Sequence, residues 1–208
     1  MDKQELEKFE KELLEDASSS LAASIKYLNC MLGYFDADTR KFYGLARQAM
    51  GEVAKKGFKD GPEFTEWQIY ERALIRALFA EIEGITAAMR QVVLWAHDRG
   101  EYSLSEIEYV NLAEKYRFNK LKDNFSLAFK YFTLLVNSQY SIDKSTSQWR
   151  TFLRSIKIRD GVMHPKTPLG FGVSGDASLD IEQTVHWFNE TYRELIRSIP
   201  NAQVTEFL

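Results

Sequence analysis

The chain has 208 residues and a net charge of −3, with 45% hydrophobic and 13% aromatic residues. These values are typical of a domain with a packed core, and they exclude a disordered chain or a uniformly basic nucleic-acid-binding protein. One cysteine, Cys30, excludes an internal disulfide and favours a reducing compartment. No signal segment and no apolar run of membrane-spanning length is found, so we expect a cytoplasmic protein that has no membrane partner.

The spacing of apolar residues predicts helices and no strands. A first helix is expected over residues 4–32, with a kink at the three serines of 18–20. Asp38 is expected to cap a second helix that ends near Lys55.

The rest of the chain is also expected to be helical. Pro62 lies in the first turn of a long helix that ends near Gly100, and the segment 103–106 fits a capping box that opens a shorter helix. Three more helices are expected over about 121–135, 146–163 and 179–199, the last of them capped by Ser178. The expected architecture is one all-α bundle: residues 1–60 form an N-terminal helical extension packed on the bundle, and residues 61–208 form the main domain.

The segment most informative about function is Arg159-Asp160-Gly161-Val162-Met163-His164, which is followed by Pro165. Asp160 and His164 are four residues apart and share a helix face, within hydrogen-bonding reach. Arg159 and His164 are five apart, which separates them by about 140° on an ideal helix. Either the last turn distorts before Pro165, or a second subunit completes the site.

An arginine, a polar residue, three further residues and a His-Pro pair at the end of an amphipathic helix resemble the signature of the HEPN superfamily. The resemblance covers about residues 62–199. It implies an all-α domain that acts as a homodimer, with both motifs in one cleft, and that cleaves RNA without a metal or another cofactor. Because such domains are common in toxin–antitoxin and antiphage systems, it also implies an antitoxin or another regulatory protein as a partner.

Four residues are the candidate catalytic group. His164 can exchange protons near neutral pH, Arg159 can stabilise charge on phosphoryl oxygens, and Asp160 can orient the imidazole. Glu81 falls inside the apolar stripe of the long helix and needs a cationic partner, for which Arg159 is the expected residue. Glu83 is expected to point to the opposite face.

Basic charge is concentrated near this motif, since the segment from Lys144 to Lys166 holds six basic residues and a single acidic one. Arg154, Lys157 and Lys166 are therefore candidates to bind the RNA backbone. The alternative is an ordinary solvated helix face.

Two other functions stay open. One is a non-catalytic HEPN-like module that binds a nucleotide or a protein, with the motif serving the fold; the other is a plain helical interaction protein. Asp160 stands where asparagine is frequent in the family, and an acid there repels a phosphate unless a cation occupies it. The glycines of 170–175 are interpreted as a loop, and His97 and His186 have no neighbours at metal-ligand spacing, so no metal site is expected.

Overall fold

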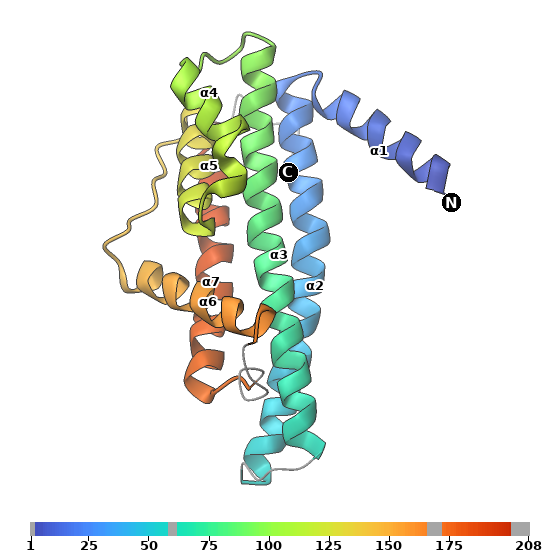
Figure 1. The fold of residues 1–208 in the computed structure, drawn as a ribbon, viewed down its shortest axis with the longest axis vertical. Coiled ribbons are helices and arrows are strands. Elements are labelled where there is room, and N and C mark those ends of the chain that lie inside the picture. Colours follow the sequence, from blue (N-terminus) through green and yellow to red (C-terminus); the bar gives the residue numbers. More distant parts are fainter. Residues whose placement is uncertain (1–2, 58–61, 166–171, 201–208) are drawn as a thin grey trace. The chain divides into compact units, whose positions relative to one another are not determined.

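The structure is a computed structural model and describes residues 3–57, 62–165 and 172–200. Every regular element in these ranges is helical, which confirms the predicted all-α class (Figure 1). In chain order the elements are α1 (Lys3–Ala17), α2 (Leu21–Lys55), α3 (Pro62–Asp98), α4 (Glu106–Ala113), the 3-10 turn η1 (Lys115–Phe118), α5 (Leu121–Leu135), α6 (Ser147–Met163) and α7 (Gly175–Arg197). None of the helices in the described ranges is long and apolar enough to cross a bilayer.

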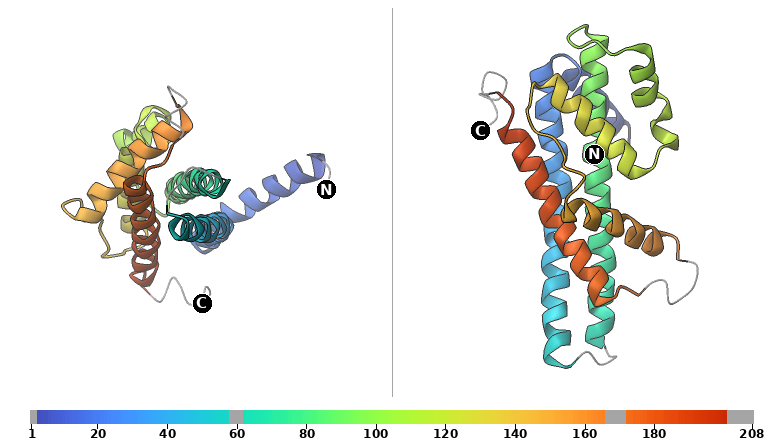
Figure 2. Two further views of the ribbon diagram at one scale, coloured as in Figure 1. Left: turned by 90° about the horizontal axis from the view of Figure 1, so that it is seen from below. Right: turned by 90° about the vertical axis from the view of Figure 1, so that its left-hand side faces the viewer.

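The chain divides into two compact units. The first comprises the described residues of 1–32, 84–141 and 194–208, and the second comprises those of 33–83 and 142–193. Helices α2, α3 and α7 contribute residues to both units. Within each unit the α2 and α3 segments run side by side (Figures 1 and 2). The predicted N-terminal extension of residues 1–60 and the predicted main domain of residues 61–208 stay predictions.

The predicted kink at residues 18–20 is a complete break between α1 and α2. The Ser20 hydroxyl accepts a hydrogen bond from the Ala23 amide at 3.2 Å, as an N-cap does, and so starts a new helix. From there α2 runs unbroken to Lys55. The prediction that Asp38 caps a second helix is therefore wrong, since Asp38 is an exposed residue inside α2. Gly33 costs only about 1 kcal/mol in a helix interior, which is too little to end this helix.

Helix α3 begins at Pro62 as predicted, and Gly100 follows its end with a φ of 76°, the left-handed value that favours glycine. The capping box of α4 lies two residues later than predicted. Ser105 and Glu108 form it, because the Ser105 amide donates to Glu108 Oε2 at 2.9 Å and the Glu108 amide donates to Ser105 Oγ at 3.4 Å. Leu104, inside the predicted box, is buried instead.

Helix α6 starts and ends where the sequence predicts. Thr146 accepts a hydrogen bond from the Trp149 amide at 3.2 Å and caps the first turn. The helix ends at Met163, and His164 leaves it with φ −131° and ψ 61°. A residue before proline is disfavoured in the helical region, so Pro165 explains this end.

Helix α7 begins earlier than predicted, at Gly175. The Ser174 hydroxyl accepts from the Ala177 amide at 3.2 Å, so Ser174 is the capping residue and the assignment of Ser178 as the cap is wrong. Ser178 is buried inside the helix. The core of the second unit is apolar and comes largely from α3, α6 and α7; its fully buried members include Leu74, Leu78, Phe79, Ile82, Phe152, Ile181 and Phe188.

Candidate functional site at the end of α6

Arg159 is held at the end of α6 by three contacts within the second unit. Its Nη2 forms an ion pair with Glu83 of α3, and its Nη1 donates to Asp160 Oδ1 at 2.8 Å. Its guanidinium also lies over the ring of Phe79, 5.6 Å from the centroid. These contacts leave the side chain 23% exposed. The expected pairing of Arg159 with Glu81 is therefore wrong, because Glu83 takes that place.

Glu81 is buried and faces α2 instead. The residue is 1% exposed, and its negative charge raises the pKa of Arg40 on α2. Burial raises the pKa of Glu81 to about 7; the Thr39 hydroxyl acts against this rise, and the negative charge of Asp36 adds to it. Neither carboxylate oxygen has a hydrogen-bond partner among the described residues. Positions 81 and 83 are about 200° apart on a helix, so α3 directs them to different neighbours.

His164 and Asp160 are both exposed. The His164 amide donates to the Asp160 carbonyl at 3.0 Å, which closes the last helical turn. Within the described part of the chain, no hydrogen bond joins the Asp160 carboxylate to the imidazole, and the carboxylate bonds to Arg159 instead. The structure therefore brings Arg159 and Asp160 together and leaves the imidazole open to solvent.

The predicted RNA-binding residues differ in whether another side chain already pairs with their charge. Arg154 donates to both carboxylate oxygens of Asp180, at 2.8 and 2.6 Å, and to Thr151 Oγ1 at 3.0 Å. Lys157 is exposed and has no ion pair with another described residue. Lys166 lies outside the described residues. Lys157 is thus better placed than Arg154 to meet a phosphate.

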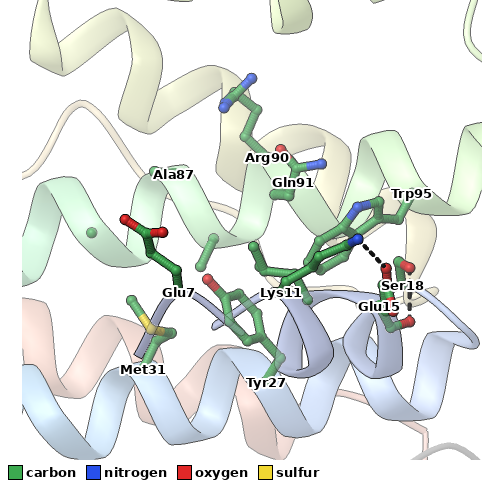
Figure 3. A pocket seen from close by; sticks show the side chains of 13 residues that line it. Glu7, Lys11, Glu15, Ser18, Tyr27, Met31, Ala87, Arg90, Gln91 and Trp95 are labelled. Atoms are coloured by element: carbon green, nitrogen blue, oxygen red, sulfur yellow. Dashed lines mark hydrogen bonds and ion pairs between the residues drawn. The ribbon is translucent and has the colours of Figure 1, made fainter. Parts of the chain in front are cut away.

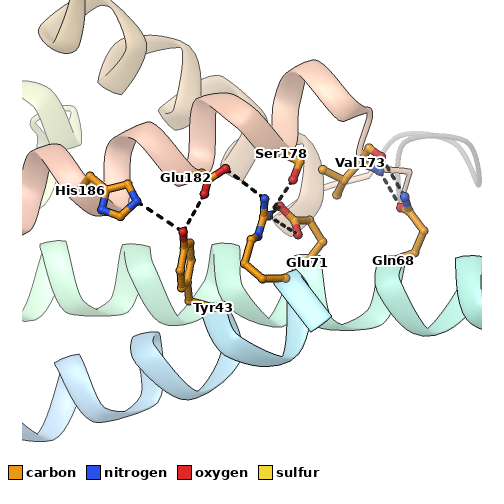
Figure 4. Close-up of polar contacts among 8 residues, drawn as sticks. Tyr43, Gln68, Glu71, Val173, Ser178, Glu182 and His186 are labelled. Carbon is orange, nitrogen blue, oxygen red and sulfur yellow. Dashed lines mark hydrogen bonds and ion pairs between the residues drawn. The ribbon is translucent and has the colours of Figure 1, made fainter. Parts of the chain in front are cut away.

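A charge network that the sequence did not predict links α2, α3 and α7 in the second unit (Figure 4). Arg47 Nη2 donates to both oxygens of the fully buried Glu71 carboxylate, at 3.2 and 3.1 Å, and to Ser178 Oγ at 2.8 Å. Arg47 Nη1 donates to Glu182 Oε2 at 3.1 Å. One cation therefore serves two carboxylates, of which one has no contact with water.

The network continues to the surface through Tyr43. Its hydroxyl donates to Glu182 Oε1 at 2.6 Å and lies 3.3 Å from His186 Nε2 (Figure 4). Burial and this hydrogen bond raise the pKa of Tyr43 to about 12, so the phenol stays protonated. A sequence signal was available: Ser178, Glu182 and His186 follow one another at steps of four and so form a polar row on α7.

The first unit holds a groove of about 820 Å³ between α1, α2 and α3 (Figure 3). Tyr27 and Trp95 meet edge to face in its wall, with ring centroids 5.6 Å apart. Helix α1 contributes Lys11 and Glu15, which form an ion pair of 3.7 Å. The other lining residues are Glu7, Leu14, Ser18, Met31, Gly84, Ala87, Ala88, Arg90 and Gln91. Its charged lining residues come from α1 and, with Arg90, from α3.

Neither the end of α6 nor the groove has the ligand set of a transition-metal centre. Over the described ranges, no three side chains of histidine, cysteine, aspartate or glutamate come together as metal ligands. No family model, curated protein or solved structure matches the chain.

Proposed function

We propose that this protein is a metal-independent endoribonuclease of the HEPN type that acts as a homodimer, with Arg159 and His164 as its catalytic residues. One observation carries the proposal. Near the C-terminal end of α6, the guanidinium of Arg159 is held against α3, and the imidazole of His164 is exposed. The basic segment of α6 adds Lys157 as an exposed cation.

The two residues would divide the chemistry between them. The His164 imidazole takes the proton of a ribose 2′-hydroxyl as the 2′-oxygen attacks phosphorus. The bond from phosphorus to the 5′-oxygen breaks, and an imidazolium returns a proton to that oxygen. Arg159 stabilises the charge on the non-bridging oxygens. The products are a 2′,3′-cyclic phosphate and a 5′-hydroxyl.

The carboxylates around Arg159 set a condition on this mechanism. Glu83 and Asp160 both bond to the guanidinium, so they compete with a phosphate for its N–H groups. Asp160 is exposed and can turn away at little cost. We therefore assign Glu83 as the positioning residue for Arg159, in the place that the sequence suggested for Glu81.

The contacts of Arg159 support a site shared between two copies. Helix α6 is regular through Met163, and only His164 departs from helical angles. Among the described residues the Arg159 guanidinium contacts Glu83, Asp160 and Phe79, and it has no contact with the imidazole of its own chain. A twofold-related copy can bring its own imidazole to the guanidinium, since symmetric pairing is the commonest form of association between identical chains.

The ion pairs of Arg159 also favour a second candidate function. With its charge matched by Glu83 and Asp160 and its plane against Phe79, Arg159 could serve only to fix α6 on α3. The protein would then be a non-catalytic HEPN-like module that binds a nucleotide or a protein partner.

Cleavage of labelled single-stranded RNA in excess EDTA separates the two functions. We expect the wild type to release fragments that end in a cyclic phosphate, and Arg159→Ala and His164→Ala to release none. Arg150→Ala and Met163→Ala are matched controls, since both residues are exposed on α6 and lie outside the proposed pair. Folded wild-type protein that binds RNA or a nucleotide without cleaving RNA would select the module.

A mixture of the two inactive variants tests the shared site. If the guanidinium and imidazole of one site come from different copies, half of the randomly mixed dimers contain one intact site. The equimolar mixture then recovers roughly a quarter of wild-type activity. No recovery, in a mixture shown to exchange subunits, would mean that each site lies within one copy.

A further inference from the structure

Four buried oxygen atoms without hydrogen-bond partners gather where α2 faces α3 in the second unit. They are Oε1 and Oε2 of Glu81, Oγ1 of Thr39 and Oδ1 of Asp36; none has a hydrogen bond of ordinary geometry to a described residue, and the only polar group that acts on the Glu81 carboxylate as a hydrogen-bond donor is the Thr39 hydroxyl within the same cluster. Glu81 and Thr39 are each 1% exposed. Buried polar groups are nearly always paired, so a group of unpaired ones indicates a bound species that completes them.

The charge near these atoms is also unbalanced. Asp36 and Glu81 bring two carboxylates, and the nearest cation is Arg40, whose side chain is 71% exposed and pairs with the other oxygen of Asp36. Water around the exposed Arg40 guanidinium weakens its electrostatic attraction for the Glu81 carboxylate. A buried carboxylate without a close cation or strong donors is unfavourable, so the cluster favours a positively charged occupant.

The donor atoms decide which cation fits. All four are oxygens, from two carboxylates and a hydroxyl, and oxygen ligands are preferred by Mg²⁺ and Ca²⁺ rather than by zinc or copper. Asp36 and Thr39 are three residues apart on one face of α2, opposite Glu81 of α3. We infer that Asp36, Thr39 and Glu81 form a binding site for one divalent cation, Mg²⁺ or Ca²⁺, which fastens α2 to α3.

This site does not depend on the proposed nuclease activity. Arg159 bonds to Glu83, and Glu81 points to α2, so the cation would support the fold and take no part in the chemistry. EDTA should then lower the melting temperature without stopping RNA cleavage.

The test is the melting temperature of the full chain, freed of metal with EDTA and dialysed at about pH 8, one unit above the pKa of Glu81. Millimolar MgCl2 or CaCl2 is compared with KCl of equal ionic strength. We expect one divalent salt to raise the melting temperature by roughly 5 °C at a hundredfold excess over the dissociation constant. Titration calorimetry should give one ion per chain.

Glu81→Gln and Thr39→Val should each lose that rise, and Thr39→Val keeps the test valid if Glu81→Gln does not fold. Asp38→Asn is the matched control, because it removes an exposed carboxylate from the same stretch of α2 and should keep the full rise. Equal effects of divalent salt and KCl, or a full divalent rise in a folded Glu81→Gln variant, would overturn the inference.

Discussion

The buried carboxylate of Glu81 makes the folded state sensitive to pH when no metal is bound. Burial raises its pKa from 4.5 to about 7; the Thr39 hydroxyl and Arg40 lower it, and Asp36 raises it. The folded state thus binds the proton more tightly than the unfolded chain. The resulting stability is fully present below pH 4.5, declines as the pH rises toward 7, and is absent above that. The two pKa values correspond to about 3 kcal/mol.

Glu81→Gln isolates this contribution. Glutamine has nearly the same shape as the protonated acid and is neutral at every pH, so the two proteins should be about equally stable near pH 4.5. At pH 8 the variant should be more stable than the wild type, by up to about 3 kcal/mol, because it has no charge to bury. The measurement is urea unfolding of both proteins in EDTA at a series of pH values across this window.

The difference between the two unfolding free energies removes the contribution of all other titrating groups. Asp38→Asn serves as the control, because it removes an exposed carboxylate from the same stretch of α2. If the Glu81→Gln difference were the same at both ends of the pH range, Glu81 would reach water in solution. Burial would then not control the charge of Glu81.

Three further predictions concern stability and RNA binding. Gly161 is helical and an added Cβ would have no atom within 4 Å, so Gly161→Ala should raise the unfolding free energy by about 0.5–1 kcal/mol. Gly100 has a φ of +76°, so Gly100→Ala should lower the unfolding free energy by about 1–2 kcal/mol in the same urea assay. Arg47→Met leaves the fully buried Glu71 carboxylate without its cation and should lower the unfolding free energy by about 3–5 kcal/mol. Adding Glu71→Gln in the same chain should restore much of that loss, and an equal loss in the double variant would contradict the pairing. Lys157→Ala should lower the slope of log affinity for single-stranded RNA against log salt by about 0.7, and an unchanged slope would remove Lys157 from the RNA-binding surface.

The sequence predicted the fold class and most helix ends because those depend on local physics. The position of Pro165 fixes where α6 stops, and α5 has the bounds that its sequence predicts, 121–135. The error at Asp38 has a local cause as well, since a good capping residue starts a helix only where the preceding chain is not helical. The apolar residues that α2 buries on both sides of this position, such as Leu28 and Ala46, keep the helix intact through it.

The contacts of the candidate site could be predicted only in part. Periodicity shows which residues of α3 are buried, but it does not show which neighbouring helix each of them faces. The Arg47 network was missed for the same reason, because Arg47, Glu71 and Glu182 are distant in the sequence and meet only when three helices pack.

Glu81 and Glu83 show why it matters which neighbouring helix each residue of α3 faces. Both are carboxylates on α3, two residues apart, and Arg159 neutralises only Glu83. Glu81 has no such partner and needs a proton or a cation. The same substitution, glutamate to glutamine, should therefore have opposite effects at the two positions. At position 81 it should stabilise the metal-free protein at high pH and spare RNA cleavage. At position 83 it should remove the ion pair that holds Arg159 against α3 and slow cleavage. A common effect at both positions would mean that α3 does not separate the two environments, and the roles assigned to both residues would fall together.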